Sequence, residues 1–174
     1  IICKNLKVKD VSRLNTALCK KIRESTREIL CDEDNLDRIP SCYHKNIMFH
    51  RDLSQEEIDS NKYNNLYGII CGKDVSDISK LINIRCLWLR SNQLNIIKTI
   101  DYKKLLELVC DYYTIENVED INYLTNLTKL SCSNTNITDV SKLVNLTELR
   151  CDNTKITDVS KLLKLKYLCC IGSS

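Results

Sequence analysis

The chain is short of glycine and proline, with three and one among its 174 residues. These two residues form most tight turns in hairpin-rich proteins, so a fold built from many β-hairpins is disfavoured. The turns must instead use asparagine, aspartate, serine and threonine. The sequence also lacks any run of about 18 apolar residues, and we therefore expect no membrane-spanning helix and no membrane among its partners.

The chain also has little net charge. Its 26 basic and 23 acidic residues leave +3, which is too small for a protein that holds nucleic acid through its phosphates. We therefore expect no nucleic-acid partner. The 43% apolar and 28% charged residues are typical of a soluble globular protein and exclude a disordered or collagen-like chain.

An internal repeat is the main signal of the sequence. The segments LTKLSCSNTNITDVSKLVN, from Leu127, and LTELRCDNTKITDVSKLLK, from Leu146, share the template L-x-x-L-x-C-x-x-T-x-I-x-x-V-x-x-L. Upstream, the template continues at spacings of 18 to 22 residues. Such a period predicts a solenoid in which each coil buries its apolar side against its neighbours. We expect one solenoid domain over residues 1–174, with about nine irregular repeats.

The two halves of each repeat have different periods. In L-x-C the two apolar side chains point the same way, as they do in a β-strand. After the strand, Ile137, Val140 and Leu143 are spaced by three residues, the period of a 3₁₀ helix or an extended threefold coil. Just before these turns lie Thr138 or Asp139, and Thr157 or Asp158, whose side-chain oxygens are suited to accept unpaired backbone N–H groups.

The amino-terminal part of the chain follows the template less closely. CKNLKVKDVSRL, from Cys3, matches CDNTKITDVSKL, from Cys151, so the chain begins inside a repeat and is predicted to be a fragment of a longer one. An insertion near residues 15–28 has apolar residues at every fourth position and predicts a short helix that covers the convex side. The unit containing Ile47 and Phe49 fits only loosely.

Most of the eleven cysteines take the place of leucine at one phase of the repeat. They are Cys3, Cys31, Cys71, Cys110, Cys132, Cys151 and Cys170. A thiol at a buried apolar position acts as a small hydrophobic group, so these residues are not expected to form disulfides. Reduced thiols predict a reducing compartment, and hence the cytoplasm.

At these residues the chain resembles the leucine-rich-repeat family, and the half-repeat I-x-D-V-S-x-L resembles the internalin class. The resemblance covers nearly all of the chain and is most specific from Ile84 to Cys170. It implies an α/β fold, a right-handed horseshoe-shaped solenoid with a concave parallel β-sheet and a 3₁₀ or irregular convex side, used mostly for protein recognition. The cysteine phase is also similar to repeats in proteins of giant amoebal viruses, which implies a viral protein in a host cell or virion.

One departure from the family concerns the asparagine that ends each strand and bonds to neighbouring backbones. It remains as Asn92 but is replaced by Asp34, Tyr113, Thr135 and Thr154 in other repeats. Some of the bonds between coils should therefore be shorter, water-mediated or absent.

A candidate partner surface follows from the solenoid. The residues exposed between the buried positions of successive strands are Leu30, Met48, Ile70, Trp88, Val109, Ser131, Arg150 and Cys169. The first five are apolar, and an exposed apolar stripe with a tryptophan and nearby arginines is typical of a binding hot spot. We predict a protein partner on the concave face, held by Leu30, Met48, Ile70, Arg85, Trp88, Arg90, Val109 and Tyr112. One alternative is that a flanking segment or a self-association contact covers this stripe, and another is that the register assumed for the weakly fitting units is wrong.

The sequence offers little for catalysis or metal binding. It contains no phosphate-binding loop, dinucleotide fingerprint or H-E-x-x-H motif, and we predict no enzymatic activity and no cofactor. Cys42, His44 and His50 lie close together, but their spacing matches no common zinc site. The glycosylation sequons at Asn126 and Asn145, and a third at Asn136, are expected to be coincidental products of the repeat.

Three functions remain open at this stage. The first is a protein-binding scaffold. The second is a structural or self-associating component joined through uncapped apolar ends, such as Leu168 to Cys170. The third is a substrate adaptor for ubiquitin transfer, a role known for other repeat proteins of the family.

Overall fold

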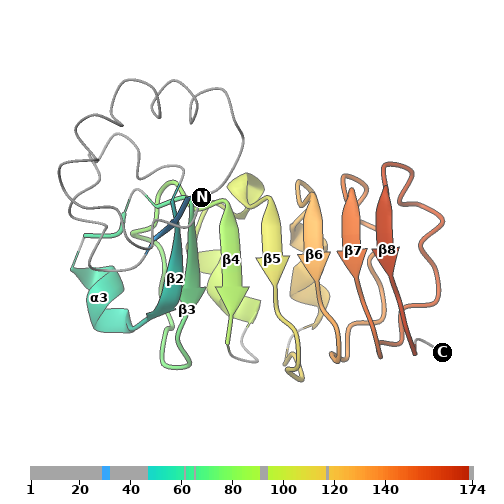
Figure 1. Cartoon of the computed structure of the whole chain (residues 1–174), viewed down its shortest axis with the longest axis horizontal. Coiled ribbons are helices and arrows are strands. Elements are labelled where there is room, and N and C mark those ends of the chain that lie inside the picture. The colour runs from blue at the N-terminus through green and yellow to red at the C-terminus, as the bar shows by residue number, and fades with distance from the viewer. Residues whose placement is uncertain are drawn as a thin grey trace.

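The structure, a computed structural model, describes residues 29–31, 47–60, 62–64, 66–90, 94–116 and 118–172, with side chains from Asp52 onward. Within these residues, eight parallel strands form one sheet in chain order, and Figure 1 shows β2 to β8 side by side in a row. The strands are β1 (Ile29–Cys31), β2 (Ile47–Leu53), β3 (Gly68–Cys71), β4 (Cys86–Leu89), β5 (Glu107–Val109), β6 (Lys129–Ser131), β7 (Glu148–Arg150) and β8 (Tyr167–Cys169).

The strands pair in the register that the repeat predicts. Leu87, Leu108, Leu130, Leu149 and Leu168 follow one another across β4 to β8 as direct partners. Because one phase of the repeat stays aligned through five coils, the predicted leucine-rich-repeat solenoid with a parallel sheet is confirmed.

The register around β2 differs from the prediction. Met48 pairs with Gly68, and after an irregularity Asp52 pairs with Ile70 and Leu53 with Cys71. The expectation that Met48 would stand beside Ile70 is therefore wrong. In this coil two apolar residues, Phe49 and Leu53, could fill the position of the repeat that Cys71 fills in the next coil. The structure pairs Leu53 with Cys71, and Leu53 is fully buried.

The core is one continuous column of leucine, isoleucine, valine and cysteine side chains. Cys71, Cys110, Cys132 and Cys151 lie in it, each at most 1% exposed, and the cysteines among the described residues are free thiols. The predicted role of this cysteine phase is confirmed for these four. Cys170 is different, because it is exposed; within the described residues no coil stacks on the outer side of β8.

The convex side is built from turns and short 3₁₀ helices. The 3₁₀ helices are η2 (Leu94–Thr99), η3 (Tyr102–Lys104) and η4 (Val118–Tyr123), all in the longer repeats. The two 19-residue repeats cross the same side with turns alone. The three-residue period of the convex side is thus confirmed. A shorter repeat omits the 3₁₀ helix on this side, and its strand keeps the same register with its neighbours.

Three aspartates cap the convex turns. Asp77, Asp139 and Asp158 each accept the backbone N–H of the serine two residues later at 2.8 Å. These bonds to the ionised carboxylate lower the pKa of each aspartate. Of the two alternatives predicted at each turn, the aspartates Asp139 and Asp158 accept these bonds, and Asp77 repeats the role in an earlier coil.

One α-helix, α3 (Gln55–Asp59), follows β2 and was not predicted. Ser54 and Glu57 form a capping box at its start, and Ile58 is buried beneath it. The Gln55 amide bonds to the backbone of Ser76 and Asp77 at 2.9 to 3.0 Å, which ties the helix to the next coil. The S-x-x-E pattern from Ser54 is a known start signal that could have revealed this helix. The helix predicted near 15–28 lies outside the described residues.

Asparagine and threonine side chains link the coils, which explains the three sequons. Asn126 donates to the Lys103 carbonyl at 2.8 Å and Asn145 to the Thr125 carbonyl at 2.9 Å. Asn136 binds both backbone groups of Ile115, at 2.7 and 3.0 Å. These side chains therefore have a structural reason to recur, beyond coincidence.

The strand-ending threonines behave as expected of a shorter side chain. Thr135 and Thr154 donate to the carbonyls of Cys132 and Cys151, at 2.6 and 2.7 Å. Each bond stays within its own repeat and does not reach the next coil. Asn136, one position later, supplies the link between coils that Thr135 is too short to make.

Candidate functional site

The predicted surface lies on the sheet face that points away from the core, here called the concave face. Its central row is Ile70, Trp88, Val109, Ser131, Arg150 and Cys169, paired in this order from β3 to β8. The backbone of Leu30 pairs with Met48 in β1 and β2, but the side chains of these two residues lie outside the described set.

Exposure along this row is less than predicted. Trp88 is 38% exposed and Val109 is half-buried, but Ile70 is only 2% exposed. Ile70 belongs to a small second apolar cluster with the buried Cys86 and the half-buried Tyr67. The prediction of an exposed Ile70 is therefore wrong, because this side chain is already packed. The exposed apolar surface in the row reduces to Trp88 and Val109.

Charged residues frame these two side chains. Arg90, at the end of β4, forms an ion pair with Asp52 at 3.0 Å, and Asp52 occupies the position opposite Ile70 in β2. Both partners of this pair are about half exposed. Arg90 thus lies two residues from Trp88 in the sequence and beside the Asp52 carboxylate.

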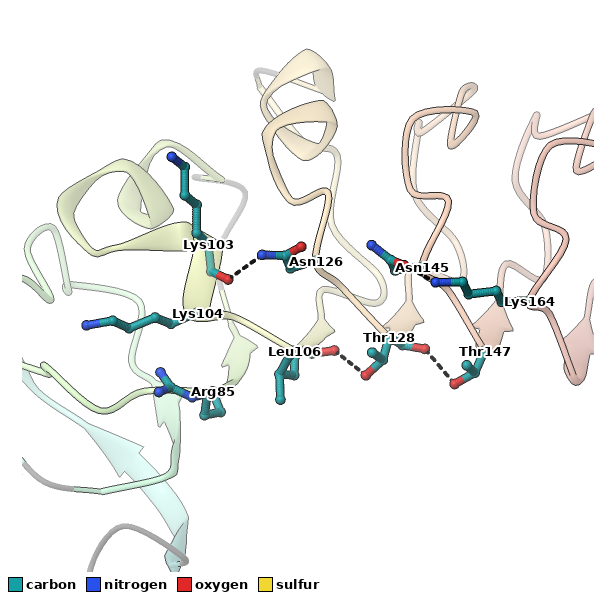
Figure 2. Close-up of a pocket in the computed structure, with 9 residues that line it drawn as sticks. All are labelled: Arg85, Lys103, Lys104, Leu106, Asn126, Thr128, Asn145, Thr147 and Lys164. Carbon is teal, nitrogen blue, oxygen red and sulfur yellow. Dashed lines mark hydrogen bonds between the residues drawn. The ribbon is translucent and has the colours of Figure 1, made fainter.

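Arg85 occupies a different place from the other predicted residues. It precedes β4 and lines a groove together with Lys103 and Lys104 at the edge where the strands begin (Figure 2). Its Nη1 donates to the carbonyl of Ile84 at 3.2 Å. The sequence placed Arg85 beside Trp88 because only three positions separate them, but the structure places it among lysines.

The concave face becomes polar toward the carboxyl end. Lys129 lies between Glu107, at 3.0 Å, and Glu148, at 4.0 Å. In the central row, the Arg150 guanidinium lies 5.6 Å from the ring centre of Tyr167. These charges are engaged with neighbouring side chains, so the exposed apolar part of the central row is confined to β4 and β5.

Tyr112 stands out at the ends of the strands. It is 77% exposed, and its φ is +69°, in the left-handed region. The equivalent positions in the next three repeats hold Asn134, Asn153 and Gly172, also with positive φ, and these residue types tolerate that backbone well. A tyrosine is strained there, and local strain of this kind is often found at binding sites.

Tyr112 borders a shallow pocket of about 370 Å³ that also includes Asp111 and Asp152. Asp111 accepts the Ser133 amide at 2.6 Å and the Ser131 hydroxyl at 2.9 Å. Asp152 accepts the Cys169 thiol at 3.2 Å and the Ile171 amide at 2.6 Å, and these bonds, the thiol first, lower the pKa of Asp152. Both carboxylates are therefore used to join coils.

We expect the change Tyr112→Asn to stabilise the protein by about 1 kcal/mol, because asparagine adopts positive φ at lower cost and tyrosine gains little from burial here. The midpoint of urea unfolding measures this. The reverse change at the equivalent position, Asn134→Tyr, should lower stability by a similar amount or more. Equal stability of wild type and Tyr112→Asn would contradict the strain.

The buried thiols are expected to resist alkylation. Burial raises the pKa of Cys71 and Cys110 to about 12 and that of Cys151 to about 11, so hardly any thiolate exists at pH 8. Peptide mapping after brief treatment with iodoacetamide should show Cys170 modified and Cys110 protected until the protein is unfolded. Modification of Cys110 as fast as Cys170 would contradict the assigned core.

The described residues show no metal site, since no three histidine, cysteine, aspartate or glutamate side chains among them gather to hold an ion. Cys42, His44 and the side chain of His50 lie outside this set. None of the helices in the same part of the chain has the length and apolar character needed to cross a bilayer.

Comparison with known proteins agrees with the repeat and the fold. Residues 125–166 match the family model described as leucine-rich repeats (2 copies). Two similar solved structures come from Listeria monocytogenes. An internalin (inlF) has a TM-score of 0.51 and 17% identity, over 81% of this chain and 51% of its own. Internalin C2 has a TM-score of 0.52 and 18% identity, over 81% of this chain and 65% of its own.

This chain therefore spans about half of one internalin structure and just under two thirds of the other. A comparison with curated protein sequences gives no significant match. At these identities the likeness establishes the fold, which is that of a leucine-rich-repeat solenoid.

Proposed function

We propose that this chain is a protein-binding scaffold whose concave face holds one protein partner around Trp88. The observation that supports it best is the exposure of Trp88, at 38%, in a row whose later members are polar and charged. Tryptophan and arginine are the residues most enriched in binding hot spots. The resemblance to leucine-rich repeats, which are used mostly for protein recognition, points the same way.

The surroundings of Trp88 favour tight binding with little rearrangement. The residue lies within β4, whose backbone is paired on both sides, with β3 and with β5. A surface built on paired strands loses little conformational entropy when a partner docks. Little of the binding energy that Trp88 contributes is therefore lost in ordering the surface around it.

The thiol in the central row does not suggest a nucleophile. Cys169 donates to the Asp152 carboxylate at 3.2 Å, and this bond raises the pKa of the thiol. A catalytic cysteine needs the opposite, a pKa lowered by a base or a positive charge. Recognition is a better account of this row than catalysis.

Site-specific photo-cross-linking tests the proposed surface. A benzophenone amino acid replaces Val109 or Tyr112 on one side of the molecule, and Tyr123, 54% exposed in η4, on the other. We expect the same partner protein to be cross-linked from Val109 and Tyr112 and not from Tyr123. Equal cross-linking of that partner from Tyr123 would count against a concave site.

A self-associating role is the second candidate, favoured by the exposed side of β8. Leu168 is 42% exposed, whereas Leu149 at the equivalent position is fully buried. A second copy that packs against β8 would cover this leucine. Molar mass measured by light scattering over a range of concentrations tests the idea, since a second copy at this strand requires a dimer that Leu168→Asp disrupts.

A further inference from the structure

A shallow, open groove runs along the edge of the sheet where the strands begin, and it is distinct from the surface around Trp88. It has a volume of about 610 Å³. Its lining residues are Arg85, Lys103, Lys104, Leu106, Asn126, Thr128, Asn145, Thr147 and Lys164. Four of the nine are basic and none is acidic, so the groove is strongly positive although the whole chain carries only +3.

The basic residues stand at the two ends of the groove. Figure 2 shows Arg85, Lys103 and Lys104 together at one end and Lys164 at the other. Lys104 pairs with Asp101 at 3.4 Å, with both side chains about half exposed, and exposed pairs of this kind are weak. The Lys164 ammonium donates to the Asn145 side chain at 2.6 Å, and its charge has no acidic neighbour among the described ion pairs.

The middle of the groove is uncharged and rigid. Thr128 and Thr147 donate their hydroxyl protons to the carbonyls of the preceding coils at 3.0 Å. Asn126 donates its amide to the Lys103 carbonyl at 2.8 Å. The oxygens of these side chains, which line the groove, keep lone pairs that can accept hydrogen bonds, and this suits the N–H groups of a peptide backbone.

We propose that this groove binds an extended acidic segment of a partner protein. Arg85 precedes β4 and Lys164 precedes β8, and four strand spacings of about 4.8 Å span about 19 Å. An extended peptide rises about 3.3 Å per residue, so about six residues cover this length. The segment has two or three acidic residues at one end, polar residues in the middle, and an acidic residue at the other end.

Nucleic acid fits this groove less well. A nucleic-acid strand carries one phosphate per nucleotide and would place charges along the whole groove, whereas Asn126, Thr128, Asn145 and Thr147 occupy its middle. Proteins that bind such strands without sequence preference use a continuous positive groove together with stacking aromatic rings. The nine lining residues include no aromatic ring.

Fluorescence anisotropy with a labelled peptide tests the proposal. The probe is Glu-Glu-Ser-Gly-Ser-Glu, titrated with the full chain at about 50 mM salt. The double variant Lys103→Glu with Lys164→Glu should bind about tenfold more weakly, because it reverses a charge at each end of the groove. The variant Lys73→Glu with Lys155→Glu changes two other exposed lysines and matches the change in net charge; it should bind within about twofold of wild type.

Three results would overturn the proposal. One is equal weakening in the two double variants, which would mean attraction to net charge alone. Another is tighter binding of a single-stranded oligonucleotide of the same charge than of the peptide. The third is no saturable binding of the peptide by wild type. Trp88→Glu should leave peptide binding unchanged. A failure of the groove proposal can therefore be told apart from a failure of the proposed concave site.

Discussion

Replacing Cys132 by aspartate is expected to unfold the carboxyl-terminal coils. Cys132 is fully buried between Cys110 and Cys151, so a carboxylate there has no water to solvate it. A protonated carboxyl could donate to the Arg150 carbonyl, which accepts the Cys132 thiol at 3.5 Å, so the cost falls mainly on the ionised form. We expect a loss of about 4 kcal/mol or more, a large part of the stability of a small domain.

The same change at Cys170 is the matched control. Cys170 has the same phase of the repeat but is exposed, so Cys170→Asp should change stability by less than about 0.5 kcal/mol. Circular dichroism during urea unfolding measures both variants. The cost at Cys132 should also be smaller at pH 4 than at pH 7, because burial raises the pKa of the new carboxyl and acid supplies its proton. A Cys132→Asp protein as stable as wild type would refute the assigned core.

The change Trp88→Glu is expected to weaken partner binding by about 2 to 4 kcal/mol, or roughly 30- to 1,000-fold in Kd. It removes the aromatic anchor of the central row and introduces a charge that the partner would have to desolvate. Trp88→Phe keeps a ring and should lose less. The effect is measured as the dissociation constant for the partner that photo-cross-linking identifies, by calorimetry with the two purified proteins.

Leu163→Glu provides the control for this experiment. Leu163 is 90% exposed and lies outside the concave row, so its replacement should leave Kd unchanged. The melting temperature of each variant shows whether a loss of binding reflects unfolding. Unaltered affinity in a folded Trp88→Glu protein would exclude the proposed site.

The sequence predicts the coils well because the periodic positions are buried ones. At Leu130, Cys132 and Val140 the residue type, the spacing and the burial all agree. The same spacing recurs in every coil, so a wrong assignment in one coil would place its residues out of register with those of the neighbouring coils. The stacked coils, their strands and the three-residue period of the convex side therefore follow from the spacing of these residues, and the resemblance to leucine-rich repeats adds that the strands form a parallel sheet.

The sequence predicts exposure on the concave face less well. A position between two buried residues is exposed only if nothing covers it, and Ile70 is packed with Cys86, a cysteine outside the regular phase. In β2 either Phe49 or Leu53 could have filled the position that pairs with Cys71, and the pairing between coils, which selects Leu53, puts Asp52 and not Met48 opposite Ile70. The basic groove was missed because Arg85, Lys103 and Lys164 are far apart in the sequence and are brought to one edge of the sheet only when the coils stack.

Each coil combines a strand that stays in register with a convex segment of variable length. The molecule is therefore modular. Coils of 19 and 22 residues stand side by side with unbroken pairing from β5 to β7. Whole coils could therefore be exchanged, shortened or duplicated by changes to the convex segments, while the pairing of the central row is kept. Such a chain is a suitable starting point for engineered binders, because each coil contributes one residue of the central row that can be changed.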